Sequence, residues 1–422
     1  MESRMELLPG VYLRAFQTDK FKTDYLSLSF VRPLTANEAP HAALLPSLLL
    51  RGTRSYPDIR SISTFLDAHY GASIGTMVRK KGEIQTTGFY ADFLDERLLP
   101  AGEQVFEPMM DFLGELLFCP CMENGLFSPD AMEGEKRNLL DTIDWTINDK
   151  RSYAVTRMLE TMCKDEAYGI PRLGTREAAE AITLQSISDY YRDLLAHSRL
   201  ELFYMGHRKP DDVAAALAKM LAPLPRDCFV PLPEVGCGSC GETRTVEEVL
   251  DVTQGKLCMG FRSGITSASP RYPAFILLNA VFGAGPTSKL FMNVREKMSL
   301  CYYASSSINS FKGIMIVSSG IEFANYELAK SEILRQLDAC VQGDITDEEL
   351  ENARRSVLSS FRASLDSPGR MEDHSLSCAI NGKDVEIEAL MAQIAAVTPA
   401  QVQEAAACLK LDTVYFLKGE TE

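Results

Sequence analysis

The chain of 422 residues repeats itself at an offset of 231 to 233 positions, and this internal repeat limits the folds that it can adopt. Leu-Leu occurs at 44–45 and 277–278, Tyr-x-Ala-Ser at 70–73 and 302–305, and Lys-Gly at 81–82 and 312–313. A near-constant spacing of this kind indicates a duplicated unit. The length is also too great for one ordinary core, so we expect two domains of similar plan.

The ends of the two halves correspond as well. Ile-Thr at 182–183 opens a helical segment before the apolar strand 202–206, and Val-Thr at 397–398 does the same before 414–419. Between the halves, residues 223–241 are rich in proline and glycine, which is typical of a linker. We therefore predict an N-terminal domain at 1–222, a linker at 223–245 and a C-terminal domain at 246–422.

Local patterns predict the fold class of both domains. Strand-forming residues are dense at 25–31, and apolar residues recur with helical spacing at 59–68. Ser128 and Pro129 form an N-terminal helix signal for a helix reaching about 145, and a second long helix is expected from 345 to about 365. Grouped strands and helices favour an α+β fold with helices packed on a mostly antiparallel sheet.

Bulk properties exclude several functions. The net charge of −15 and the lack of a basic cluster argue against nucleic-acid binding. The first residues contain no signal-peptide pattern, and no apolar run is long enough to cross a membrane. The eleven cysteines lie mostly among apolar residues, as free thiols do in a reducing compartment. We expect a cytoplasmic protein.

One segment of the first half carries a specific resemblance. Arg-Gly-Thr-Arg-Ser-Tyr-Pro at 51–57, followed by a helix and Tyr-Gly-Ala at 70–72, resembles the insulinase (pitrilysin-like) zinc peptidases. In that family an inverted motif, His-x-x-Glu-His, precedes the Gly-Thr pair. Its histidines bind zinc, its glutamate activates the zinc-bound water, and a later glutamate is the third ligand. The resemblance also implies a clamshell arrangement of two homologous domains.

None of these catalytic positions keeps its chemistry here. Anchoring on Gly-Thr at 52–53 places the first histidine at Ala43, the glutamate at Pro46 and the second histidine at Ser47. The segment resembling the third-ligand helix, 135–142, places the ligand at Thr142, with Glu135 one heptad earlier. A proline inside a helix also costs about 3 kcal/mol. We predict no catalytic residues and no metal site in this chain.

Other metal-type residues do not rebuild a site. The five histidines, at 41, 69, 197, 207 and 374, are too far apart in sequence to share one helical turn, and we interpret them as surface or boundary residues. Cys237 and Cys240 lack the second ligand pair that a structural zinc site needs, so we interpret them as linker thiols. Cys119 and Cys121 are interpreted as turn and packing residues.

The second half keeps its own family motif, whereas the first half has lost the zinc motif. Residues 290–302 resemble the family's C-terminal motif, Leu-Arg-Glu-x-x-Gly-Leu-x-Tyr, whose arginine and tyrosine contact the substrate backbone. Arg295 and Tyr302 match those two positions, while Val294 replaces the leucine and Ser299 the glycine. A guanidinium and a phenol both donate hydrogen bonds to a peptide carbonyl. The resemblance therefore implies that Arg295 and Tyr302 bind substrate.

Lost ligands beside a retained substrate-binding pair suggest a shared site. Some bacterial members of the resembled family are heterodimers in which one chain holds zinc and the other holds this pair. We expect a non-catalytic subunit of such a heterodimeric metallopeptidase, with peptide as substrate, zinc in the partner and a possible homodimer in isolation. Two alternatives stay open: a stand-alone peptide-binding or scaffold protein without proteolysis, and an active peptidase with an unrecognised metal site.

Overall fold

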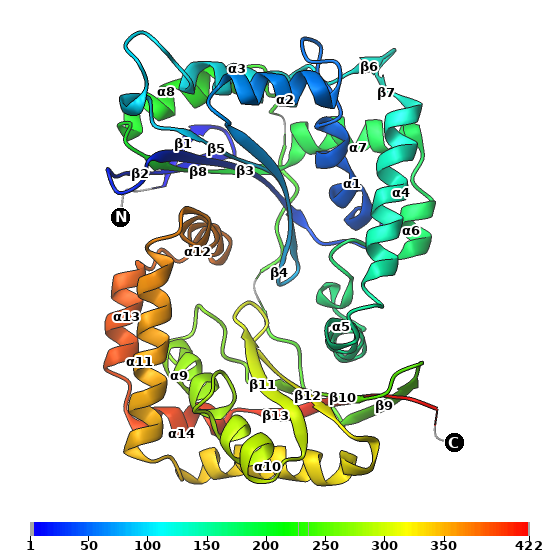
Figure 1. Ribbon diagram of the computed structural model, residues 1–422, viewed down its shortest axis with the longest axis vertical. Helices are drawn as coiled ribbons and strands as arrows, with labels where there is room; N and C mark the ends of the chain where they lie inside the picture. Colours follow the sequence, from blue (N-terminus) through cyan, green and yellow to red (C-terminus); the bar gives the residue numbers. More distant parts are fainter. Residues whose placement is uncertain (1–3, 227, 235, 421–422) are drawn as a thin grey trace. The chain divides into compact units, whose positions relative to one another are not determined.

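The computed structural model describes residues 4–226, 228–234 and 236–420, which divide into two compact units (Figure 1). Unit 1 contains residues 1–144, 170–233 and 368–379, apart from those that the structure does not describe. Unit 2 contains residues 145–169, 234–367 and 380–422 with the same exception. Each half of the sequence therefore gives one segment to the unit built mainly from the other half. The domain boundaries predicted from the sequence, 1–222 and 246–422 with a linker at 223–245, do not include this exchange of segments, and they stay a prediction.

The sheet of unit 1 has six strands in the order β1-β2-β8-β3-β5-β4. The β2–β8 pair is parallel, and every other neighbouring pair is antiparallel. Strand β3 contains the predicted segment 25–31, and nine of its eleven residues are buried because helices cover both faces at this position. The strands are β1 (Met5–Leu8), β2 (Val11–Gln17), β3 (Thr23–Pro33), β4 (Ser73–Lys81), β5 (Ile84–Leu94) and β8 (Arg199–Gly206).

The five-stranded sheet of unit 2 repeats this topology. Its order is β11-β12-β10-β13-β9, with a parallel β13–β9 pair and antiparallel pairs elsewhere. Starting from the parallel edge, the two orders are β2-β8-β3-β5-β4 and β9-β13-β10-β12-β11, so corresponding strands occupy corresponding places. The strands are β9 (Arg244–Val249), β10 (Gly255–Arg262), β11 (Cys301–Asn309), β12 (Ile314–Ile321) and β13 (Lys410–Lys418).

The helices lie between the strands in the same order in both halves, except that one further helix follows the last strand of the first half. In the first half they are α1 (Ala39–Leu49), α2 (Ile59–Ala68), α3 (Phe106–Phe118), α4 (Pro129–Trp145), α5 (Lys150–Met162), α6 (Arg176–Glu180), α7 (Leu184–His197) and α8 (Pro210–Met220). In the second they are α9 (Tyr272–Phe282), the π-helix η3 (Leu290–Lys297), α10 (Tyr326–Gln342), α11 (Asp347–Ser364), α12 (Pro368–Asn381), α13 (Ile387–Ala395) and α14 (Pro399–Ala407). Short 3₁₀ turns lie at η1 (Glu96–Leu98), η2 (Ala167–Gly169) and η4 (Phe323–Asn325), and β6 (Met122–Glu123) pairs with β7 (Leu126–Phe127).

The main core of each unit lies between its sheet and its own helices. In unit 1 this core is formed by strand residues such as Leu26 and Leu28 against α1, α3, α7 and α8. In unit 2 it is formed by residues such as Met259 and Phe261 against α9, α10, α11 and α14. Burial at about 25 cal/mol per Å² makes these apolar layers the main stabilising contribution in each unit.

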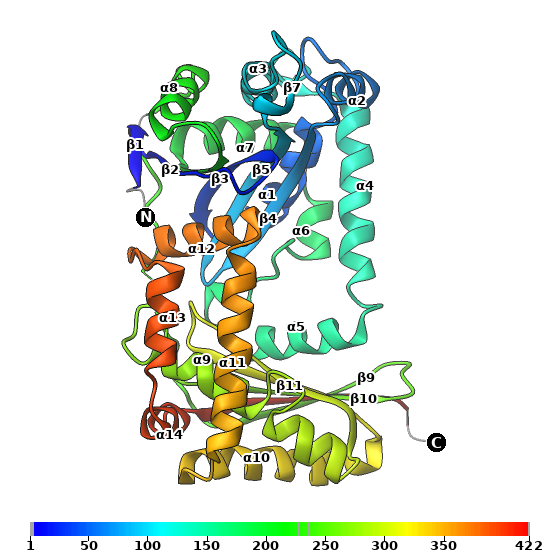
Figure 2. The ribbon, with the colours of Figure 1, turned by 60° about the vertical axis from the view of Figure 1, so that its left-hand side comes forward.

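The exchanged helices cover the opposite face of each sheet. Met158 and Met162 of α5 pack against Cys258 and Tyr415 of the unit 2 strands. In unit 1, Met371 of α12 packs beside the buried cluster of Tyr25, Phe203 and Met205. Figures 1 and 2 show α12, in orange, on the side of the unit 1 sheet opposite α8.

Ion pairs fasten both exchanged segments. Glu372 of α12 contacts Arg79 of β4 at 2.6 Å, and Asp373 contacts Lys81 at 2.7 Å. In unit 2, Glu166, which follows α5, contacts Arg262 at 2.6 Å and Lys312 at 2.7 Å. Both segments are therefore held by charge as well as by apolar packing.

The α+β prediction, with helices on mostly antiparallel sheets, is confirmed. The helices predicted at 59–68 and 129–145 are α2 and α4, and the one predicted from 345 is α11, which Thr346 caps. Among the described residues, none of the helices combines the length and apolar content that crossing a bilayer requires.

Candidate functional site

The resemblance places the zinc-site residues at Ala43, Pro46, Ser47 and Thr142, which we call the degenerate positions. Helix α1 carries the first three of them. Ala43 and Ser47 are half-buried, and Pro46 is buried inside the helix. A methyl group and a pyrrolidine ring have no donor atom for zinc, and a serine hydroxyl is a poor substitute for imidazole. The helix nevertheless continues from Ala39 to Leu49 through the proline.

A buried threonine compensates for the proline. Pro46 has no N–H to donate to the carbonyl of Ala42, four residues earlier. The hydroxyl of Thr87, on β5, donates to that carbonyl at 2.7 Å instead. Because an unsatisfied buried carbonyl is costly, this bond explains how α1 tolerates proline. The sequence contained no signal for it, since the partners are 45 residues apart.

The fourth position, Thr142, lies on an exposed turn of α4 and donates its hydroxyl proton to the carbonyl of Asn138 at 2.7 Å. Glu135, one heptad earlier, is engaged elsewhere. Its carboxylate contacts Arg51, just beyond α1, at 3.3 Å and accepts a hydrogen bond from the Asn138 amide at 3.2 Å. The Glu135 carboxylate therefore links α4 to the segment after α1.

These side chains do not fit a catalytic zinc ion. The four degenerate positions provide two hydroxyl groups, a methyl group and a proline ring, in place of two imidazoles and two carboxylates. Nor do the described residues contain any group of three or more His, Cys, Asp or Glu side chains placed to hold a metal. All five histidines are half-buried. No reaction step is therefore assigned to a metal at these four positions.

A cavity of about 450 Å³ opens in unit 1 between the N-termini of α2 and α4. Its lining includes Arg51, Asp58, Arg60, Cys121 and Asp130, a mixture of both charges. Asp58 is the N-cap of α2, and the Cys121 thiol lies 3.0 Å from the carbonyl oxygen of Thr53. None of the four degenerate positions lines this cavity.

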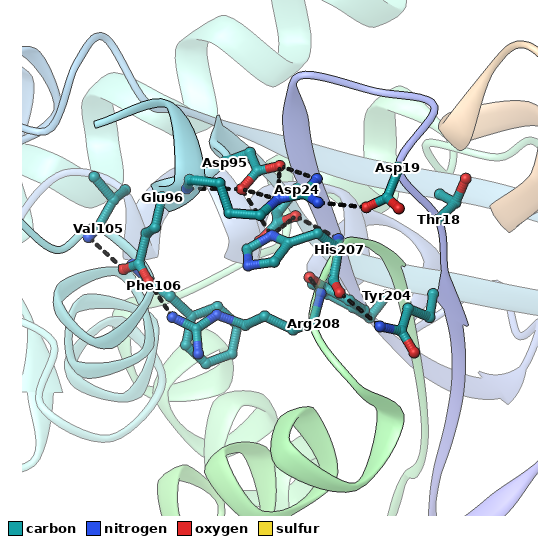
Figure 3. A network of polar contacts seen from close by, with 12 residues as sticks. Thr18, Asp19, Asp24, Asp95, Glu96, Val105, Phe106, Tyr204, His207 and Arg208 are labelled. Atoms are coloured by element: carbon teal, nitrogen blue, oxygen red, sulfur yellow. Dashed lines mark hydrogen bonds and ion pairs between the residues drawn. The ribbon is translucent and has the colours of Figure 1, made fainter. Parts of the chain in front are cut away.

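A buried polar network around His207 joins the ends of three strands in unit 1 (Figure 3). The Nδ1 atom of His207 lies 2.9 Å from Asp95 Oδ1 and 3.5 Å from Asp24 Oδ1. Burial raises the pKa of the Asp24 carboxyl, although the charge of His207 opposes the change. Burial also acts to raise the pKa of Asp95, but hydrogen bonds from Arg97 outweigh it and hold that pKa below its ordinary value. The network fastens β3, β5 and β8 together, which the sequence did not predict for His207.

Arg295 lies on η3 in unit 2, with an exposed side chain. The buried residues Leu290 and Val294 anchor this π-helix to the core. The guanidinium carbon of Arg295 lies 4.6 Å from the ring centroid of Phe291, and its Nε lies 3.6 Å from a carboxylate oxygen of Glu296. π-Helical turns are rare and occur often at functional sites.

A left-handed turn leads from Arg295 to Tyr302. Ser299, at the position of the family glycine, has a φ of 54°, which explains why that position favours glycine. The N–H groups of Ser299 and Leu300 donate to the carbonyls of Arg295 and Val294, both at 3.1 Å. The backbone of Arg295 is thereby fixed by the turn that follows it.

Tyr302 lies in a bulge at the start of β11. The register of β11 on β12 shifts between Cys301 and Tyr303, and Tyr302 is the extra residue. Its side chain is 62% exposed, whereas the ring of Tyr303 is covered by Arg151 at 4.1 Å. Bulges redirect a side chain and are common near functional sites. The sequence predicted Tyr302 as a binding residue but did not predict the bulge.

Two α+β units of one repeated strand order, with no imidazole or carboxylate at the four positions expected to form the zinc site, match a metallopeptidase-type fold whose metal-binding motif is degenerate. The family model described as "Peptidase M16 inactive domain" matches residues 181–357. The chain is 33% identical over 413 residues to a Bacillus subtilis (strain 168) protein named "Probable inactive metalloprotease YmfF", with 97% of this chain and 96% of that protein covered. The chain therefore belongs to the M16 peptidase family, as a homologue of its inactive members.

Other relatives and solved structures agree with this assignment. A Streptomyces coelicolor protein named "Uncharacterized zinc protease SCO5738" is 26% identical over 88% of this chain and 78% of its own length. The crystal structure of a conserved protein from Enterococcus faecalis V583 superposes with a TM-score of 0.90 at 31% identity, covering 100% of this chain and 99% of that one. A peptidase M16 inactive domain from Pseudomonas fluorescens has the same fold, with a TM-score of 0.82 at 18% identity, covering 100% and 98% of the two chains.

The bond from Thr87 to the Ala42 carbonyl can be tested by a double-mutant cycle. We expect Thr87→Val to lower the free energy of unfolding by about 1–3 kcal/mol, because a buried carbonyl loses its donor. In a Pro46→Ala background the backbone N–H of residue 46 can donate to that carbonyl, so the same substitution should cost clearly less. Urea unfolding followed by circular dichroism measures both effects. Thr76→Val, at an exposed position of β4, is the control and should change stability little. Equal costs in the two backgrounds would contradict this account.

The positive φ of Ser299 predicts that glycine stabilises the turn. Ser299→Gly should raise the free energy of unfolding by about 1 kcal/mol, because a non-glycine residue is strained in the left-handed region. The matched control is Ser359→Gly, at an exposed position inside α11, which should lower it by about 0.5 kcal/mol. Differential scanning calorimetry gives both Tm values. A lower Tm for Ser299→Gly would show that the turn does not have this conformation.

Proposed function

We propose that this chain is the zinc-free subunit of a two-chain M16 metallopeptidase and contributes Arg295 and Tyr302 to peptide binding. The observation that carries the proposal is the contrast between the two units. The positions of α1 and α4 where the resemblance places metal-site residues carry no imidazole or carboxylate, whereas Arg295 and Tyr302 are exposed next to a fixed turn and in a bulge. A chain that had lost all peptide processing would have no need of such a surface.

The chemistry of the pair suits a supporting role. A guanidinium and a phenol donate hydrogen bonds to a peptide carbonyl and stabilise negative charge that develops on its oxygen. They cannot replace the metal-activated water that the family uses for hydrolysis. The proposed partner is therefore a zinc-bearing chain of the same family, and the proposed substrate is a peptide.

The first test compares the single chain with its assembled complex. The native protein is isolated from its own cells with any bound partner, and the same chain is expressed alone. We expect chelator-sensitive cleavage of a mixed-sequence fluorogenic peptide library by the complex and none by the chain alone, even with added zinc. Strong cleavage by the pure chain would refute the proposal. Peptide binding without any co-purifying peptidase would favour a stand-alone binding protein instead.

The second test removes the donors one at a time within the complex. Arg295→Ala and Tyr302→Phe should each lower kcat/KM by about tenfold or more without dissociating the complex, as loss of a charge-stabilising donor does elsewhere. Matched controls are Arg355→Ala, at an exposed site on α11, and Tyr70→Phe, the repeat counterpart of Tyr302. These controls should leave kcat/KM unchanged. Unchanged values in both site variants would count against a shared site.

A further inference from the structure

The contact between Arg295 and Phe291 has a defined geometry. Phe291 is half-buried, and the guanidinium carbon lies 4.6 Å from the centroid of its ring. A cation within about 6 Å of a ring centroid and over its face is attracted to it electrostatically. The two residues are four apart on η3, a spacing at which side chains are neighbours on a helical surface.

Stacking of this kind restricts one face of the guanidinium and leaves its N–H edge available. Within the part of the chain that the structure describes, no acceptor forms a hydrogen bond with the Arg295 guanidinium, and Glu296 approaches Nε only to 3.6 Å. The side chain remains 42% exposed. The guanidinium presents several N–H donors in one plane, and here that plane is fixed by the ring while the N–H edge stays accessible. Such a group fits a planar oxygen acceptor, such as a carboxylate or a peptide carbonyl.

We propose that Phe291 is a positioning residue that orients Arg295 toward a planar acceptor, either a peptide carboxylate or a backbone carbonyl. The inference rests on the proposed function and defines the chemistry that Arg295 recognises. The ring does not touch the ligand. It reduces the number of guanidinium orientations, so less conformational entropy is lost when the acceptor binds.

The stack itself is tested in the full chain by NMR. The Nε–H resonance of Arg295 is assigned by its loss in Arg295→Lys and should be shifted by the ring current of Phe291. The shift should vanish in Phe291→Leu and Phe291→Met and persist in Phe291→Tyr. Two ring-free variants are used because Phe291 is half-buried, and the one whose Tm stays nearer the original is used for binding. A resonance that is the same with and without the ring would overturn the proposal.

Binding is tested with two probes, N-acetyl-trialanine as the free acid and the same peptide as its C-terminal amide. Titration into the chain should displace the Arg295 resonance, and loss of the ring should weaken binding about three- to fivefold, which corresponds to a cation–π contact at an exposed site. Phe291→Tyr should restore the original affinity. Binding of the acid alone identifies a carboxylate ligand, and equal binding of both peptides identifies a backbone carbonyl. If neither probe displaces the resonance, or if the ring-free variant binds as tightly, the proposal is wrong.

The two proposals fail in distinguishable ways. If the stack and its effect on binding are observed but Arg295→Ala leaves turnover of the complex unchanged, then the shared-site function is wrong and the recognition chemistry stands. If Arg295→Ala abolishes turnover while Phe291→Leu matches the original chain in KM and kcat, then Phe291 has no positioning role and the shared-site function stands.

Discussion

Coverage of both faces of each sheet is the constraint on which this structure depends. A sheet that buries one face against its own helices still exposes an apolar second face, where Phe203 in unit 1 and Tyr415 in unit 2 lie. The chain covers these faces by exchange, with α12 on one sheet and α5 on the other. Glu372 and Glu166 then form ion pairs that fix the exchanged segments. Neither half of the sequence contains all the elements of one complete unit.

The two units share one sheet topology but differ in the side chains that they present at their candidate functional positions. In unit 1, helix α1, where the resemblance places the zinc motif, is a packing element in which Thr87 compensates for Pro46. In unit 2 the surface of η3 and β11 is shaped by features that stability alone would not favour. A serine at positive φ, a π-helical turn and a bulge all lie within ten residues of Arg295. Local strain retained in so short a segment is consistent with a binding role.

Much of the fold was predictable because it follows from periodicity and repetition. Helix α2 has apolar residues at helical spacing, α4 begins at the Ser128–Pro129 signal, and the repeat in sequence corresponds to the repeated strand order. The exchange of α5 and α12 was not predictable, because helical spacing shows that a face is apolar but not which sheet will cover it. The same limit applies to Thr87 and to the His207 network. Their partners are distant in sequence, and local patterns contain no information about them.

The candidate site divides in a similar way. The prediction for Ala43, Pro46, Ser47 and Thr142 rests on residue identity alone, because a missing donor atom needs no structure to be recognised. The orientation of Arg295 needed coordinates. The backbone conformation of η3 determines whether the guanidinium forms an ion pair, stacks on a ring or faces solvent. The contact with Phe291 could therefore be seen only in the structure.

The proline in α1 has a consequence for anyone who would re-engineer hydrolysis into this chain. Grafting two imidazoles and a carboxylate onto α1 would also return an amide proton at residue 46, directed at the Ala42 carbonyl that already accepts from the Thr87 hydroxyl. A carbonyl oxygen can accept two hydrogen bonds, so the two donors would have to share one acceptor within a packed core. Thr142 would still need a carboxylate in its place, and a graft of the motif onto α1 alone would therefore leave the metal one ligand short.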